Sequence, residues 1–161
     1  LKGHTPQPAD FRFTRAARVL QTGTGSGVML GGNLAVLAAL CGTQDQPSFK
    51  GKFALIEELG EPLYRVDRML DQLHRAGAFF GLKGLIIGEM VKVEEPDFGQ
   101  DLDALFIDSF ARYHPDIPII ANYPAGHGKH RLTLPFGVPA SLQALENGHI
   151  ALTHTNLFTQ P

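Results

Sequence analysis

Apolar and polar positions follow two patterns along this chain, a helical spacing and short continuous apolar runs. The stretch 62–77 repeats its apolar residues at the spacing of one helical face, while its charged residues fall mostly off that face. The apolar positions are Leu63, Val66, Leu70 and Leu73, and the charged ones are Arg65, Arg68, Asp71 and Arg75. With Pro62 in the first turn and Gly77 as a stop, the pattern predicts an amphipathic helix.

Short apolar runs on both sides of this helix predict buried strands. The predicted strands are 18–21, 28–30, 53–56, 85–87 and 117–121, and two further helices are predicted at 34–41 and 101–113. Because strands and helices alternate, we expect a single α/β domain with a parallel layer. Residues 1–10, with two prolines, are expected to form an extended lead-in.

The last part of the chain has a different pattern. Residues 131–134 and 141–145 alternate or run apolar, 146–149 have the composition of a hairpin turn, and 150–154 form a returning strand. We therefore expect a β-rich part attached to the parallel layer.

A glycine-rich stretch, 23–42, invites interpretation as a phosphate loop. Its glycines do not have the spacing of the dinucleotide fingerprint, and no Lys-Ser or Lys-Thr pair follows them as in a Walker motif. We instead expect a turn at 23–27, a strand, and then a second turn at Gly31 and Gly32 that leads to a helix capped by Asn33. The free amides at that helix start suit a carboxylate as well as a phosphate, although a plain strand-to-helix turn explains the glycines equally.

Composition and charge limit the binding partners and the cellular compartment that we expect for this chain. The chain has 161 residues and a formal net charge of −2, with a pI near 6.4, so we expect no nucleic acid or anionic membrane partner. The lone Cys41 cannot form an intrachain disulfide and weakly favours a reducing, cytoplasmic location. The longest apolar stretch, 27–42, is broken by Asn33 and is shorter than the ~20 residues of a membrane span.

Candidate catalytic side chains follow two of the predicted strands. Glu57, Glu58 and Glu61 come just after strand 53–56, and His127 lies in a glycine-flanked loop after strand 117–121. Parallel strands bring such positions to one edge of a sheet, where a carboxylate and an imidazole can form the orienting half of a nucleophilic triad. We expect Glu57 within hydrogen-bond reach of His127; the alternative is that both are solvated surface residues.

A metal site at the same loop is not expected. His127 and His130 have a spacing that occurs at metal sites, but no third ligand follows at a clear spacing. Lys129, between the two histidines, would also repel a dication. We expect no metal and no cofactor.

Four segments in order, GVMLGGNLAVLAALCGT, GKFALIEELGEPLYRVDRMLDQLHRAG, GLIIGE and YPAGHG, resemble the C-terminal half of the LD-carboxypeptidases. This serine peptidase family includes muramoyltetrapeptide carboxypeptidases and microcin C self-immunity peptidases. The resemblance implies a Ser-Glu-His triad: an N-terminal α/β domain holds the serine and the oxyanion hole, and a swivelling β/β/α domain supplies glutamate and histidine. Glu57 and His127 match those two positions. Relatives commonly have Glu-Asp where this chain has Glu57-Glu58, so both carboxylates stay candidates.

The serines of this chain do not complete such a triad. None of Ser26, Ser48, Ser109 and Ser141 sits at a strand-to-helix elbow. We therefore expect the 161 residues to be the C-terminal domain alone, partnered by its own N-terminal domain, with a homodimer left open. The resemblance implies hydrolysis of the amide before the terminal D-alanine of a murein tetrapeptide, in peptidoglycan recycling, or of a related peptide. Gly32 and Asn33 are candidates to meet its terminal carboxylate.

Two readings without catalysis stay open. The chain could be a metabolite- or nucleotide-binding α/β module, against which the failed glycine spacing argues. It could also be a purely structural swivelling domain.

Overall fold

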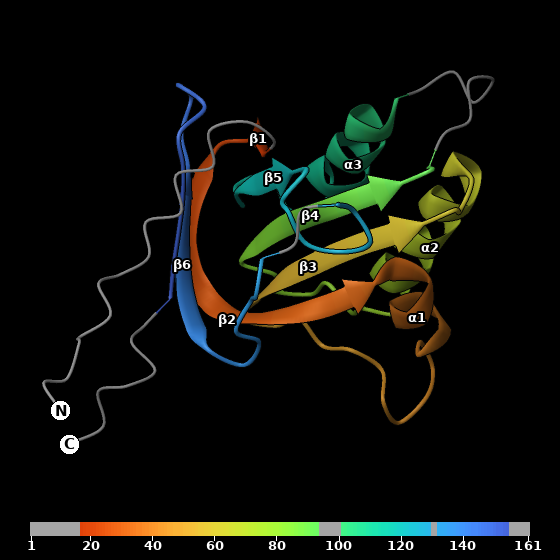
Figure 1. Ribbon diagram of the computed structural model, residues 1–161. Coiled ribbons are helices and arrows are strands. Elements are labelled where there is room, and N and C mark those ends of the chain that lie inside the picture. Colours follow the sequence, from red (N-terminus) through yellow and green to blue (C-terminus); the bar gives the residue numbers. More distant parts are fainter. Residues whose placement is uncertain (1–16, 94–100, 130–131, 155–161) are drawn as a thin grey trace, which may run out of the picture.

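The computed structural model describes residues 17–93, 101–129 and 132–154, which form one mixed sheet with helices on one side (Figure 1). The expected lead-in 1–10 lies outside the described residues. The elements are β1 (Arg18–Gln21), β2 (Gly23–Asn33), α1 (Leu34–Ala39), β3 (Lys52–Leu59), α2 (Leu63–Arg75), β4 (Gly84–Val91), α3 (Leu102–Ala111), β5 (Ile119–Ala121), β6 (Pro139–Ala144) and β7 (Ile150–His154). In the sheet the strands follow the order β1-β5-β4-β3-β2-β6-β7.

The centre of the sheet is parallel, as the alternation of strands and helices predicts. β2, β3, β4 and β5 pair in parallel, while β1 lies antiparallel to β5 and the ribbon of β6 and β7 runs antiparallel beside β2. The α/β class and the attached β-rich part are thus confirmed. The hairpin turn predicted at 146–149 joins β6 to β7.

The β-rich part is expected to include residues 131–134, but the described residues of this segment, 132–134, do not form a strand. Residues 132–134 have no strand partner, although Leu132 and Leu134 pack against the buried side chains beneath them. Their alternation therefore reflects contact with the core by an irregular segment.

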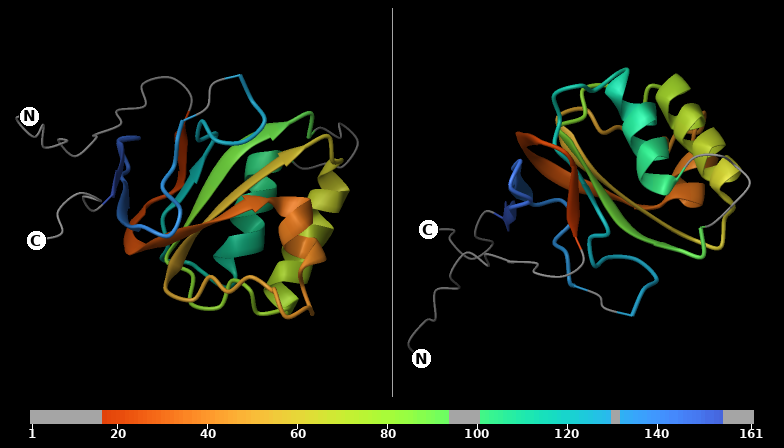
Figure 2. Two further views of the ribbon diagram at one scale, coloured as in Figure 1. Left: turned by 60° about the horizontal axis from the view of Figure 1, so that its bottom comes forward. Right: turned by 90° about the horizontal axis from the view of Figure 1, so that it is seen from above.

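Two apolar cores lie on opposite faces of the sheet. The helices cover one face, where the predicted apolar positions of α2 are buried. Residues 122–129, which follow β5, lie on the other face, as the right view of Figure 2 shows. Successive residues of β3 consequently enter different cores. Ala54 and Ile56 face the helices, whereas Phe53 and Leu55 belong to the second core. No described helix has the length and apolar character needed to cross a membrane.

Residues 23–33 of the glycine-rich stretch form one continuous strand, so the turns predicted at 23–27 and at Gly31 and Gly32 are wrong. The first half of β2 pairs with β6 and the second half pairs with β3, with Val28 in both ladders. A side chain at Gly25 would overlap the carbonyl of Lys83, and a Cβ at Gly27 would lie 2.6 Å from the carbonyl oxygen of Gly51. These glycines allow a strand to pass close to two neighbouring turns, which is a packing requirement.

Candidate active site

The alternation of side chains between the two faces of β3 decides where the carboxylate of Glu57 lies. It shares the strand face of Phe53 and Leu55, and only 9% of its side chain is exposed. Its position near the end of β3 puts the carboxylate at the edge of the sheet where the parallel strands finish. A nearly buried carboxylate at this edge requires a polar partner.

His127 is that partner. Its Nδ1 atom lies 2.7 Å from Oε2 of Glu57, as predicted, and 49% of its side chain is exposed. The loop that carries it continues from β5 and is attached to β4 by two main-chain bonds: Tyr123 donates to the carbonyl of Ile87 at 3.0 Å, and Glu89 donates to that of Ala125 at 2.8 Å. Parallel strand ends therefore bring together two residues that are far apart in the sequence.

The loop backbone lies directly on the glutamate. Gly126 has φ of +121°, and a Cβ there would be 2.9 Å from both Cβ and Oε2 of Glu57. Earlier in the same segment, Tyr123 is fully buried, and burial raises its pKa to about 12, so its hydroxyl is neutral at physiological pH. The carboxylate of Glu57 thus lies directly against a tight glycine loop.

Glu58 points to the other face and binds the start of α1. Its carboxylate accepts hydrogen bonds from Nδ2 of Asn33 at 2.7 Å, from the amide of Ala35 at 2.8 Å and from the amide of Leu59 at 2.8 Å. It is only 2% exposed. Of the two candidate carboxylates, Glu57 is therefore the one that faces the imidazole, while Glu58 fixes the corner between β2 and α1.

The segment Gly32-Asn33 lies next to Glu57, because Asn33 and Glu57 are opposite each other in the β2–β3 ladder. Oδ1 of Asn33 caps α1 by accepting from the amide of Val36 at 3.2 Å. Since Glu58 already binds the amide of Ala35, the helix start is less open than the sequence suggested. One Nδ2 hydrogen of Asn33 is left for a ligand within the described residues, so a binding role of Gly32 and Asn33 stays a prediction.

The serines lie elsewhere in the fold. Ser26 is in β2, Ser48 precedes β3, Ser109 is in α3, and Ser141 in β6 shares a 2.6 Å hydrogen bond with the hydroxyl of Thr153. Within the described part of the chain, His127 forms a hydrogen bond with Glu57 alone. The arrangement can therefore orient an imidazole, but a hydroxyl nucleophile has to come from outside it.

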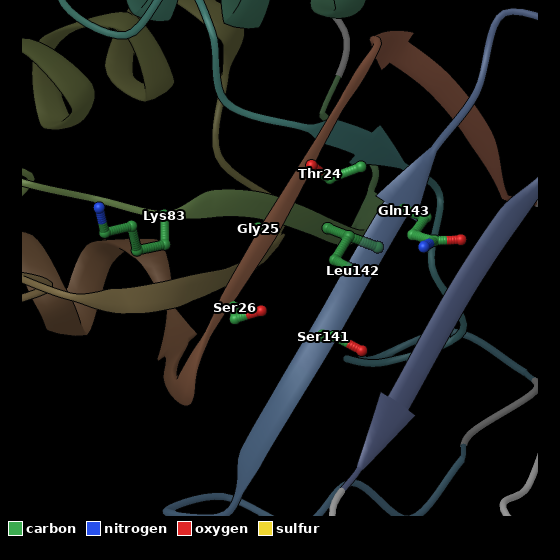
Figure 3. A pocket seen from close by; sticks show the side chains of 7 residues that line it. All are labelled: Thr24, Gly25, Ser26, Lys83, Ser141, Leu142 and Gln143. Atoms are coloured by element: carbon green, nitrogen blue, oxygen red, sulfur yellow. The ribbon is translucent and has the colours of Figure 1, made fainter.

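A hollow of about 460 Å³ lies at the opposite end of the parallel strands (Figure 3). Its lining residues are Thr24, Gly25, Ser26, Lys83, Ser141, Leu142 and Gln143. Lys83 directly precedes β4, whereas Glu57 lies close to the end of β3. This hollow is therefore separate from the Glu57–His127 pair.

Metal ligands do not gather in the part of the chain that the structure describes, where no three histidine, cysteine or acidic side chains are placed to share an ion. His130, the second histidine of the spacing noted above, lies outside the described residues.

Comparison with known proteins identifies relatives of this arrangement. Residues 26–142 match the family model of the LD-carboxypeptidase C-terminal domain. A putative carboxypeptidase of Streptomyces coelicolor is 37% identical over 133 residues, which cover 82% of this chain and 41% of that protein. The murein tetrapeptide carboxypeptidase of Pseudomonas aeruginosa is 29% identical over 120 residues, covering 73% and 38%.

The solved structures give the same result for the fold. The crystal structure of a muramoyltetrapeptide carboxypeptidase from Oxalobacter formigenes matches with a TM-score of 0.74 and 32% identity, covering 88% of this chain and 50% of that one. The chain thus spans half or less of the length of each of these relatives.

Proposed function

Because this chain belongs to the LD-carboxypeptidase family, we propose that it is the C-terminal domain of a serine-type LD-carboxypeptidase and supplies two members of its Ser-Glu-His triad. The contact between Nδ1 of His127 and Oε2 of Glu57 is the observation that carries the proposal. The nucleophilic serine and the oxyanion hole belong to an N-terminal domain outside the 161 residues.

In this mechanism, each imidazole nitrogen has one task. Glu57 accepts a hydrogen bond from Nδ1–H of His127, which fixes the tautomer and leaves Nε2 free to take the proton of the serine hydroxyl. The serine oxygen then attacks the amide carbon, and the imidazolium, stabilised by Glu57, gives its proton to the leaving amine. A water molecule, deprotonated by the same imidazole, then attacks the acyl carbon; the ester bond breaks, and the imidazolium returns the proton to the serine oxygen. The exposed half of His127 is where the partner domain would meet it.

The proposed substrate is a murein tetrapeptide, cleaved at the L,D amide before its terminal D-alanine. Support comes from the Pseudomonas aeruginosa and Oxalobacter formigenes relatives, which are named as a murein tetrapeptide carboxypeptidase and a muramoyltetrapeptide carboxypeptidase. The substrate's terminal carboxylate would meet the Gly32-Asn33 segment, which lies beside Glu57 in the sheet. A role in peptidoglycan recycling, a cytoplasmic location and a homodimer are parts of the same proposal, and the homodimer is checked by the molecular mass in solution.

The decisive experiment measures D-alanine release by the complete protein, including its N-terminal domain. His127→Ala should lower kcat by about a thousand-fold or more, and Glu57→Gln, which disturbs the tautomer, by about a hundred-fold or more, with little loss of stability. His149→Ala is a matched control, since His149 is an exposed residue of the β6–β7 turn. A folded His127→Ala enzyme with full activity would refute the proposed mechanism.

A further inference from the structure

Strand β4 carries one extra residue opposite Glu57. Ile56 of β3 pairs with Ile87, but Glu58 pairs with Met90, so Gly88 and Glu89 together oppose Glu57. Regular alternation would turn Glu89 toward the helices together with Leu85 and Ile87, which lie in the helix-side core. An extra residue in a strand resets this alternation, and such bulges often re-aim a side chain next to an active site.

Glu89 contacts the His127 loop through both its main chain and its side chain. Its amide donates to the carbonyl of Ala125. Its carboxyl group fills the space that a side chain at position 128 would need, so Gly128 packs directly on it. The neighbouring Gly88 is equally close, since a Cβ there would overlap the carbonyl oxygen of Ala125 and lie 3.0 Å from Cβ of Glu57.

One carboxyl oxygen of Glu89 is buried at an energetic cost. Within the described residues, Oε2 is inaccessible to solvent and has no hydrogen-bond partner. A buried acceptor without a donor is destabilising, and more so if it is charged. An apolar side chain of similar size would fill this position without that cost, so packing alone does not explain a glutamate here.

We propose that Glu89 is a positioning residue for His127. Its carboxylate packs against Gly128 and so fixes the position of the loop from which the imidazole reaches Glu57. Glu89 acts through the loop and does not touch the substrate. The expected effect of Glu89 on turnover rests on the proposed function. The expected effect of Glu89 on the position of His127 does not depend on that function.

The test compares stability with turnover in the complete protein. Glu89→Met keeps the length of the side chain and removes the buried oxygen, so its thermal midpoint should be unchanged or higher. Because the substitution removes the carboxylate on which Gly128 packs, the loop no longer holds the imidazole in the same position, and kcat should fall about 10- to 100-fold while KM changes less than about two-fold. Glu146→Gln, at an exposed acid of the β6–β7 turn, is the control and should change neither quantity. A merely structural role of Glu89 would instead lower the thermal midpoint.

A second measurement needs no activity. In the 161-residue chain, the NMR signals of the His127 ring report its contact with Glu57, and Glu89→Met should shift or broaden them while Glu146→Gln should not. Gly128→Ala pushes the loop from the other side of the same contact and should disturb the same signals. Unchanged His127 signals in both variants, with unchanged kcat, would overturn the assignment. If instead Glu57→Gln and His127→Ala enzymes stay active, the proposed function fails, and the NMR comparison still decides the position of His127.

Discussion

The carboxylates of Glu57 and Glu58, consecutive residues of β3, lie on opposite faces of the sheet and bind different elements. Glu57 meets the imidazole of His127, which is 70 residues further along the chain. Glu58 meets Asn33 and the first amides of α1. One step along a strand therefore separates the carboxylate proposed for catalysis from one that holds the neighbouring helix in place.

Replacement of Glu58 should reduce stability strongly. Glu58→Ala removes three hydrogen bonds to a buried carboxylate and leaves Nδ2 of Asn33 and the amide of Ala35 without their acceptor. We expect the free energy of unfolding to fall by about 3 kcal/mol, measured by urea denaturation. Glu61→Ala, at a surface ion pair with Arg65, is the comparison and should cost less than about 1 kcal/mol. Equal small losses in both variants would contradict this account of Glu58.

The 161-residue chain should have no peptidase activity by itself. Within the described residues His127 forms a hydrogen bond with Glu57 and with no hydroxyl group, and the proposed oxyanion hole belongs to the N-terminal domain. Addition of the N-terminal domain should restore D-alanine release. Turnover by the isolated chain, together with labelling of Ser26, Ser48, Ser109 or Ser141 by a serine-directed reagent, would place the nucleophile here and contradict the prediction.

Asn33→Ala should weaken recognition of a free chain end. If the remaining Nδ2 hydrogen of Asn33 binds the terminal carboxylate, KM should rise more for a free-acid substrate than for its amide, about ten-fold against two-fold. The substitution also removes a helix cap, so Asp101→Ala, which removes the corresponding cap of α3, serves as the control. Equal changes in KM for acid and amide would remove Asn33 from the binding site.

Stability should decrease below neutral pH because of His74. The pKa of His74 is lowered from 6.5 to about 4, mainly by burial and in part by the nearby His114, while Asp71 opposes this shift. Burial also lowers the pKa of His114. Since the unfolded chain takes up these protons at higher pH than the folded chain, stability is complete above pH 6.5 and falls as the pH drops toward 4.

We expect the free energy of unfolding to fall by roughly 1–2 kcal/mol over that range. Urea denaturation at several pH values measures this loss. His74→Phe should flatten the pH dependence, because His74 packs edge-on against Phe79 and Phe110 and its Nε2 atom has no hydrogen-bond partner within the described residues. The same slope in this variant as in the unchanged chain would show that other groups are responsible.

The sequence predicts the part of the site that depends on strand ends. Alternating strands and helices imply a parallel layer, and a parallel layer brings Glu57 and His127 to one edge. The choice between Glu57 and Glu58 depends on which face of β3 each occupies. Since both faces of β3 carry apolar residues, the sequence pattern does not mark either face.

Two features depend on contacts that local sequence does not report. The glycines at 23–27 have the composition of a turn, but pairing with β6 and close contact with the turns at Gly51 and Lys83 make them a strand. The sequence pattern does not mark Glu89, because its orientation follows from an extra residue in β4, which a strict two-residue period does not predict. In the sequence, the signal for this position is a glutamate beside a glycine near the end of a predicted strand.

The double pairing of β2 also sets an order of assembly. Its second half pairs with β3, which begins only a short loop beyond α1, whereas its first half pairs with β6, as in Gly27 with Ala140. Contacts so distant along the chain pay a larger loop-closure entropy, so we expect the parallel layer to form before the ribbon of β6 and β7 docks. Until then, the first half of β2 is an unpaired edge. Its glycines and hydroxyl side chains offer little apolar surface, which makes this temporary edge a poor template for aggregation.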